Sequence, residues 1–180
     1  QGIDVVAGYI EPHARPETME LMEGLEALPP KLVLRRGIAL QDFDLDAALA
    51  RRPALVLVDE LAHTNAPGMR HAKRWQDVRE LLDQGIDVYT SLNVQHLESL
   101  SDVVASITGI VVSETVPDTL FDEVERIELI DLPPEELEER FREGKVYIPA
   151  QDEAAMRNFF QRPKLVALRE IALRRMAEHV

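Results

Sequence analysis

Strand-like and helix-like segments alternate along the first 110 residues of the chain, and the connections between them are short. The strand-like segments are residues 3–10, 29–35, 54–60 and 86–93. The helix-like segments are residues 16–28, 44–52, 74–84 and 95–109. This alternation predicts an α/β fold with a doubly wound, mostly parallel sheet.

The segment ALVLVDE at residues 54–60 is a continuous apolar run that ends in two acids, Asp59 and Glu60. A continuous apolar run is typical of a central parallel strand that is covered on both faces. We therefore expect this segment to lie in the middle of the sheet, with its acids at the carboxyl end.

The pattern is less regular after Gly109. There we expect a helical turn at residues 117–124, a strand at 126–132, an acidic helix at 133–144 and two final helices that are broken at Pro163. In the last helix Leu165, Leu168, Ala172 and Met176 share one face, which indicates a packing surface. This organisation predicts a core domain at residues 1–145 and a helical C-terminal extension at residues 146–180 that leads to the next domain.

The segment QGIDV occurs at residues 1–5 and again at residues 84–88. The second copy follows a helix-like segment, so Gly85 occupies the position of a glycine that ends a helix. By analogy, the first copy predicts a helix before residue 1. We therefore expect the chain to be a piece of a longer protein.

The charge and composition exclude several classes of function. The net charge of −13 argues against a nucleic-acid-binding surface, which would need a basic footprint. No apolar run approaches the roughly 18 residues that cross a bilayer, so we expect no direct insertion into a membrane. The absence of cysteine excludes disulfides and thiolate metal sites. Residues 113–143 carry a net charge of −9, which indicates either a solvated face or a surface for a basic partner.

Polar side chains follow three of the predicted strands, at the point where each strand ends. They are Glu11, His13 and Arg15 after the first strand, Asp59 and Glu60 after the apolar run, and Asn93 and Gln95 after the strand at 86–93. The carboxyl ends of parallel strands meet at one edge of the sheet, where ligands bind in open α/β folds. We therefore expect one cofactor-binding site, formed by Glu11, Arg15, Asp59, Glu60, Asn93 and Gln95.

Neighbouring carboxylates suit Mg²⁺ bound to phosphate, because this ion keeps several waters and takes only one or two protein carboxylates. In this interpretation Asp59 and Glu60 bind Mg²⁺ through water, and Glu60 orients or activates a nucleophile. Asn93 and Gln95 would sense a γ-phosphate or its attacking water. The alternative is that the two acids cap the mouth of a loop. The spacing of the histidines matches no zinc pattern.

The glycine-rich phosphate loop GxxxxGK[ST] does not occur in the chain. This loop supplies the backbone N–H groups and the Lys that hold the phosphates of a nucleotide. We therefore expect residues 1–180 by themselves to bind nucleotide weakly or not at all, and to have no catalytic activity by themselves.

Several segments resemble the N-terminal cytoplasmic domain of the KdpD family of bacterial potassium- and turgor-responsive sensor histidine kinases. They are GYIEPHARPET, LVLVDELAHTN, KRWQDVRELLDQGIDVYTSLNVQHLESLSDVV, TGIVVSETVPD and LPPEEL…REGKVYIP, which together cover nearly the whole chain. In EPHARPET, Pro12 and Ala14 stand where the family pattern has Thr and Gly, so a role for a flexible glycine is not carried over.

The resemblance implies a fold of the P-loop NTPase type, whose first strand, phosphate loop and first helix would precede residue 1. It implies that the full-length protein binds ATP and Mg²⁺, with Asp59 and Glu60 as the Walker-B acids. A stress-protein-like domain, transmembrane helices and the transmitter kinase would follow residue 180, and the phosphorylated histidine would lie there. The chain would then be a regulatory cytoplasmic domain of a bacterial inner-membrane protein that controls potassium uptake through a response regulator.

Two other functions stay open at this point. The first is a phosphoryl-transfer enzyme of the thymidine-kinase type, in which Glu60 would be a general base for a nucleoside hydroxyl. Such an enzyme would need a substrate lid and often a zinc site, and nothing after Gly109 resembles either. The second is a protein-interaction module that uses no nucleotide and binds a basic partner through residues 113–143.

Overall fold

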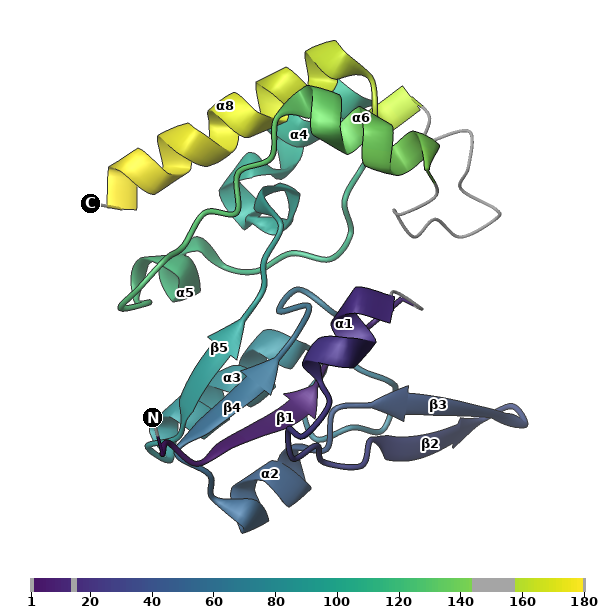
Figure 1. Ribbon diagram of the computed structural model, residues 1–180, viewed down its shortest axis with the longest axis vertical. Helices are drawn as coiled ribbons and strands as arrows, with labels where there is room; N and C mark the ends of the chain where they lie inside the picture. The colour runs from purple at the N-terminus through teal and green to yellow at the C-terminus, as the bar shows by residue number, and fades with distance from the viewer. Residues whose placement is uncertain (1, 14–15, 144–157, 180) are drawn as a thin grey trace. The chain divides into compact units, whose positions relative to one another are not determined.

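The computed structural model describes residues 2–13, 16–143 and 158–179, and the chain divides into two compact units, Gln1–Leu92 and Asn93–Val180 (Figure 1). Each unit has buried apolar residues of its own. The predicted domain boundary between residues 145 and 146 lies outside the described residues. The division between the two units is an additional boundary that sequence patterns did not indicate.

A three-stranded parallel sheet forms the centre of the first unit. Its strands are β1 (Val5–Tyr9), β4 (Leu55–Val58) and β5 (Asp87–Thr90), in the order β1-β4-β5. Helix α3 (Arg74–Asp83) makes the crossover between β4 and β5 that two parallel neighbours require. The apolar run is the central strand, as predicted, and its Val56 side chain is fully buried. The structure thus confirms an α/β fold with a mostly parallel sheet.

Strand β1 approaches its neighbours very closely at Gly8. A Cβ atom at this position would lie 2.7 Å from side-chain atoms of both Phe43 and Val56, which is closer than carbon atoms pack. The register between β1 and β4 also shifts at this residue, between Ala7 and Tyr9. Glycine is therefore the residue that fits here without displacing the core.

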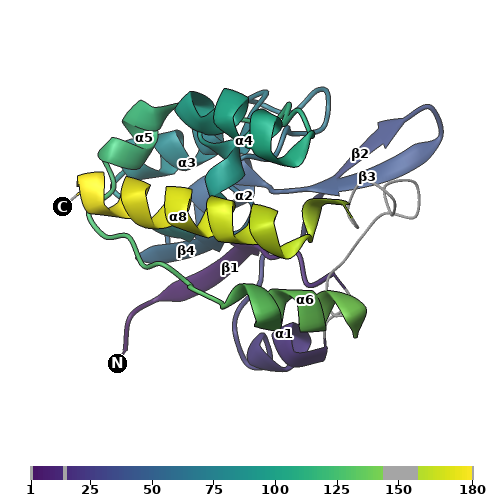
Figure 2. The ribbon, with the colours of Figure 1, turned by 90° about the horizontal axis from the view of Figure 1, so that it is seen from above.

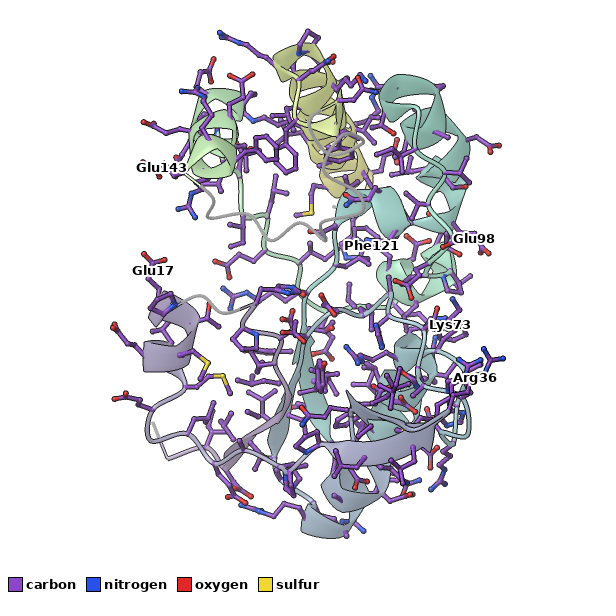
Figure 3. The ribbon with its side chains drawn as sticks, turned by 90° about the vertical axis from the view of Figure 1, so that its right-hand side faces the viewer. Glu17, Arg36, Lys73, Glu98, Phe121 and Glu143 are labelled. Carbon is purple, nitrogen blue, oxygen red and sulfur yellow. The ribbon has the colours of Figure 1, made fainter. Side chains whose placement is uncertain are left out.

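Strands β2 (Lys31–Arg35) and β3 (Ile38–Asp42) form an antiparallel hairpin that is separate from the parallel sheet. The hairpin projects away from the sheet in Figures 1 and 2. The sequence predicts β2 but not its partner β3. Arg36, labelled in Figure 3, and Gly37 form the turn, with φ angles of 49° and 83°. Positive φ at both positions is the pattern of a type I′ hairpin turn.

Helix α1 (Pro16–Leu21) is shorter than the predicted helix at residues 16–28. The chain turns at Gly24, whose φ is 80°, and then pairs with the outer edge of β1. There Ala7 donates its N–H to Glu26 O at 2.8 Å and accepts a hydrogen bond from the Leu28 N–H at 2.9 Å. The prediction of a longer helix is wrong because this pairing satisfies backbone groups of β1 that would otherwise be buried and unpaired.

Three helix ends have typical capping residues, and among them Gly85 confirms a predicted helix end. Asp44 caps α2 (Leu45–Arg51), because its carboxylate accepts a hydrogen bond from the Ala47 N–H at 3.0 Å. Gly85 follows α3 with a φ of 74°, and Gly109 follows α4 (Ser101–Thr108) with a φ of 76°. Glycine adopts this left-handed conformation without the steric cost that other residues have.

The described part of the second unit is helical. Its elements are the 3₁₀ turns η1 (Val94–His96) and η2 (Glu98–Leu100) and the helices α4, α5 (Asp118–Asp122), α6 (Pro134–Arg142) and α8 (Arg162–His179). The predicted helix at 95–109 is thus α-helical only in its second half, and its first half forms the two 3₁₀ turns. The predicted strand at 126–132 is wrong, because the described part of this unit offers no sheet with which a strand could pair.

Helix α8 packs against η1, α4 and α6 of the second unit, and Figure 2 shows it between α4 and α6. Leu165 and Leu168 of the predicted apolar face are buried. Lys164 at the start of the helix donates a hydrogen bond to Thr108 O at 3.3 Å. Among the described residues, no helix combines the length and the apolar character needed to cross a bilayer.

Candidate functional site

Asp59, Glu60 and Leu61 form a turn directly after β4, which we call the acid turn. Its backbone is tied to the strands on both sides. Asp59 donates its N–H to Tyr9 O at 2.8 Å, and Leu61 donates its N–H to Ser91 O at 3.0 Å. Glu60 has a φ of 55° in the left-handed region, which costs a residue other than glycine about 1–2 kcal/mol. The acid turn therefore lies at the carboxyl edge of the sheet, as predicted.

The Asp59 carboxylate is surrounded by hydrogen-bond donors. Its Oδ1 accepts from the Glu60 N–H at 3.0 Å and from the Ser91 hydroxyl, and its Oδ2 accepts from the Glu11 N–H at 3.4 Å. Because both oxygens already accept hydrogen bonds, the carboxylate is held in a fixed orientation. This arrangement suits contact with a cation through water better than direct coordination.

Glu60 and Glu11 present carboxylates that are partly open to solvent, with side chains 40% and 33% exposed. His13 lies between them. Its Nε2 is 3.3 Å from Glu60 Oε1, and its backbone N–H donates to Glu11 Oε1 at 3.2 Å. The structure therefore brings three of the predicted site residues, Glu11, Asp59 and Glu60, into one cluster.

Tyr9 supports this cluster through its hydroxyl, which donates to Glu11 Oε2 at 3.1 Å. Burial and the negative charge of Glu11 raise the pKa of Tyr9 to about 12. The hydroxyl consequently stays protonated at neutral pH and remains a donor to the carboxylate.

The other predicted residues lie outside the described part of the first unit. Arg15 lies outside the described residues. Asn93 and Gln95 belong to the second unit, where Asn93 accepts a hydrogen bond from the His96 N–H at 3.0 Å and so opens the turn η1. The first unit by itself therefore does not contain them.

Ser91 is a site residue that sequence reasoning missed. Its hydroxyl donates to the Asp59 carboxylate and accepts a hydrogen bond from the Glu60 N–H at 3.2 Å. The signal that could have identified it is a hydroxyl residue directly after β5, at the same edge of the sheet as the two acids.

A buried ion pair adjoins the acid turn. Arg74 and Asp42 are 0% and 1% exposed, and Arg74 Nη2 donates to Asp42 Oδ1 at 2.8 Å. Asp42 also accepts from the N–H groups of Phe43 at 2.8 Å and Ala66 at 2.6 Å. Burial acts to raise the pKa of Asp42, but hydrogen bonds from His63, Ala66, Arg74 and Phe43 outweigh it and hold the pKa well below its usual range.

Comparison with known families gives a match over the whole chain. The family model described as KdpD, osmosensitive K⁺ channel His kinase sensor domain, covers residues 1–180. The chain belongs to the KdpD family. This confirms the resemblance that the strand-end motifs indicate.

Two curated relatives of this KdpD-family chain are named Sensor protein KdpD. The protein of Escherichia coli K12 is 59% identical over 180 residues. The protein of Clostridium acetobutylicum is 56% identical over 179 residues. These alignments cover 100% and 99% of the chain but only 20% of each relative. Putative sensor protein KdpD of Synechocystis is 50% identical, and the alignment covers 100% of the chain and 49% of that protein. The chain thus corresponds to a fifth to a half of the length of these KdpD proteins.

The basic loop at residues 62–73 of this KdpD-family chain is tied to the first unit. Arg70 forms an ion pair with Glu80, and His71 Nε2 lies 2.7 Å from Glu80 Oε2. The loop ends at Lys73, labelled in Figure 3, which is the N-cap residue of α3. Arg70 and His71 thus both contact the same acid of the first unit, Glu80.

The acid turn of this KdpD-family chain is a surface edge. A hollow of about 250 Å³ lies elsewhere in the first unit and is lined by Leu49, Arg52, Arg70, Glu80, Gln84 and Ile86. No group of three or more His, Asp or Glu side chains in the described residues is arranged to hold a metal ion. A cation at the acid turn would therefore need ligands in addition to its side chains, such as water or phosphate oxygens.

Proposed function

We propose that this chain is the regulatory, cytoplasmic sensor domain of a membrane-bound two-component histidine kinase that controls potassium uptake. Support comes from the family description, osmosensitive K⁺ channel His kinase sensor domain, and from relatives named Sensor protein KdpD. The parent would be a bacterial inner-membrane protein. From the family resemblance we propose that the parent also contains a stress-protein-like domain, membrane helices and a transmitter domain. The transmitter would act on a response regulator.

We propose further that the acid turn is part of a Mg–ATP site in the full-length protein. The observation that carries this proposal is the convergence of Glu11, Asp59 and Glu60 at the carboxyl edge of a parallel sheet. Asp59, whose oxygens are already engaged, would hold Mg²⁺ through water. Glu60, which is partly exposed, would orient a nucleophile. The bound ion would neutralise negative charge on the phosphates.

The open edge of β5 supports a fold of the P-loop NTPase type. The outer edge of β1 is covered at Ala27, whereas β5 pairs only with β4 among the described residues. We propose that a further parallel strand, which leads into a phosphate loop and precedes residue 1, pairs with β5. This placement would bring the loop to Ser91 and the acid turn.

Titration of the full-length protein with Mg–ATP tests this function. Asp59→Asn and Glu60→Gln should each weaken binding about 10- to 100-fold, the range expected when a hydrogen bond to a charged group is lost. The thermal unfolding midpoint should change little, because the Glu60 side chain is partly exposed and Asn keeps the shape of Asp59. Arg15, Asn93 and Gln95 remain predicted nucleotide contacts and can be substituted in the same assay.

Asp87→Asn is the matched control, because Asp87 is an exposed acid at the opposite end of β5. This variant should bind Mg–ATP as the wild type does. Equal weakening by all three substitutions would indicate a general charge effect and contradict the site. Micromolar binding of Mg–ATP by residues 1–180 alone would contradict the placement of the phosphate loop outside these residues.

A further inference from the structure

Arg74 connects three strand ends of the first unit. It is the first residue of α3, and its side chain is fully buried. Its Nη1 donates to Asp59 O at 3.0 Å, and its Nη2 donates to Asp42 Oδ1 at 2.8 Å. Its guanidinium carbon lies 4.2 Å from the centre of the Tyr9 ring, a cation–π contact. One cation thus contacts the ends of β1 and β3 and the turn that follows β4.

The contact with Asp59 fixes the orientation of one peptide group. The peptide between Asp59 and Glu60 is held at its oxygen by Arg74, and its N–H donates to Asp59 Oδ1 at 3.0 Å and to Ser91 Oγ at 3.2 Å. The orientation of this peptide sets the φ of Glu60, which is 55°. Such a backbone conformation persists only where surrounding contacts enforce it. Rotation of the peptide would relieve the strain and redirect both carboxylates.

The contact with Asp42 allows this cation to be buried. An unpaired buried charge is strongly destabilising, and the bond to Asp42 offsets that penalty. Glu60 adds a second acid, because its Oε2 lies 3.9 Å from Arg74 Nη1. The Nε of Arg74 is buried without a hydrogen-bond partner, which costs about 1–3 kcal/mol. Burial of Arg74 therefore costs free energy that a packing role alone does not explain. Its hydrogen bond to Asp59 O is made to the acid turn.

We propose that Arg74 is the positioning residue of the acid turn. Through Asp59 O it keeps the following peptide in the orientation that presents both acids, and Asp42 holds the guanidinium in place. Because Asp42 is the last residue of β3, the geometry of the acid turn depends on the position of the β2–β3 hairpin. The consequence for Mg–ATP binding rests on the proposed function, whereas the effect on the turn itself does not.

Amide hydrogen exchange of residues 1–180, read by NMR without ligand, tests the effect on the turn. Arg74→Lys keeps a cation beside Asp42 but cannot donate in parallel to both acceptors. Asp42→Asn keeps the shape and removes the counter-charge. Relative to the rest of the first unit, both variants should accelerate exchange at the amides of Glu60 and Leu61 about tenfold or more, as expected for a local opening.

Leu81→Ala is the matched control. Leu81 is fully buried on the same helix, two turns after Arg74, so its truncation should destabilise the unit through a cavity. This variant should accelerate exchange throughout the first unit without a particular effect on the acid turn. If Arg74 had only a packing role, Arg74→Lys would give this same uniform pattern, and that result would overturn the proposal.

Titration of the full-length protein with Mg–ATP separates this proposal from the function on which it rests. Arg74→Lys should weaken binding about tenfold, and Leu81→Ala should not weaken it at a temperature where the protein stays folded. Faster local exchange in Arg74→Lys with unchanged Mg–ATP binding would show that Arg74 holds the turn and would overturn its consequence for nucleotide binding. If the wild-type protein binds no Mg–ATP, the proposed function fails, and the exchange data still decide whether Arg74 holds the turn.

Discussion

Asp42 and Asp77 are both almost completely buried in the first unit, yet their pKa values shift in opposite directions. Hydrogen bonds, including one from Arg74, hold the pKa of Asp42 low in spite of burial. For Asp77, burial raises the pKa to about 6, because the hydrogen bond from the Asn65 amide, at 2.5 Å, does not compensate for the loss of water. The donors around each carboxylate decide the direction of the shift.

Asp77 should make the stability of the first unit fall as pH rises. Its pKa moves from 3.8 to about 6 on folding, so the folded state binds the proton more tightly. The stability contributed by the protonated form is complete below the unfolded pKa and is lost as pH rises through about 6. Asp77→Asn should remove this dependence and raise the free energy of unfolding at pH 7 by about 1–3 kcal/mol.

Thermal unfolding midpoints measured between pH 4 and pH 7 would check this prediction. Asp83→Asn is the control, because Asp83 is an exposed acid at the end of the same helix. The advantage of Asp77→Asn over the wild type should grow with pH, while Asp83→Asn should follow the wild type. Parallel profiles for Asp77→Asn and the wild type would show that Asp77 does not titrate in this range.

Part of the candidate site was predictable because it follows strand ends. Glu11, Asp59 and Glu60 each come directly after a recognisable strand, and parallel pairing brings them to one edge. Ser91 and Arg74 were missed for a physical reason. Their contacts with Asp59 span 32 and 15 positions and depend on side-chain directions that local patterns do not encode.

At the scale of elements, local patterns predicted β1, β4, α3 and β5 but neither the β2–β3 hairpin nor the end of α1. The hairpin turn uses Arg36 before Gly37, where Asn or Asp is the usual signal for a type I′ turn. Helix α1 ends early because Ala27 pairs with β1, and this tertiary contact overrides helical propensity. Both features depend on pairing partners that no single segment specifies.

Gly8→Ala tests the close approach of β1 to its neighbours. The added methyl group would lie 2.7 Å from Phe43 and Val56 side chains that are fully buried, so the core would have to move. We expect a loss of about 1–3 kcal/mol in the free energy of unfolding, which is typical of overpacking. Urea unfolding followed by the fluorescence of Trp75, which lies in the first unit, would measure it.

The double variant Gly8→Ala/Val56→Ala is the control for this mechanism. Val56→Ala by itself should destabilise the unit through a cavity, but in the double variant it makes room for the added methyl group. The losses in the free energy of unfolding measured for the two single variants should therefore sum to more than the loss measured for the double variant. Simple additivity would mean that the cost of Gly8→Ala arises from something other than the contact with Val56.

Across the chain, the net charge of −13 is unevenly distributed. Acidic residues within 113–143 have ion-pair partners in the second unit itself. Three arginines of α8 form ion pairs with them: Arg162 with Glu135, Arg169 with Asp131, and Arg175 with Asp118 and Asp122. A basic protein that bound this acidic segment would compete with these contacts. The same pairs dock α8 onto the unit.

Arg175→Gln should destabilise the second unit selectively. The Arg175 side chain is 15% exposed, donates to Asp122 at 2.5 Å and lies 4.7 Å from the centre of the Phe121 ring. Its loss leaves Asp118 and Asp122 without this cation, and we expect a decrease of about 1–3 kcal/mol in the free energy of unfolding. Arg174→Gln, at the exposed neighbouring position, should change it by less than about 0.5 kcal/mol.

Two probes allow this prediction to be assigned to one unit. Trp75 is the single tryptophan of the chain and lies in the first unit, whereas the described elements of the second unit are all helical, so circular dichroism reports strongly on it. Arg175→Gln should lower the urea midpoint of the circular-dichroism transition and leave the fluorescence midpoint in place. Equal effects of Arg174→Gln and Arg175→Gln would show that the ion pairs do not hold α8. A matching shift of the fluorescence midpoint would show that the two compact units unfold as one cooperative body.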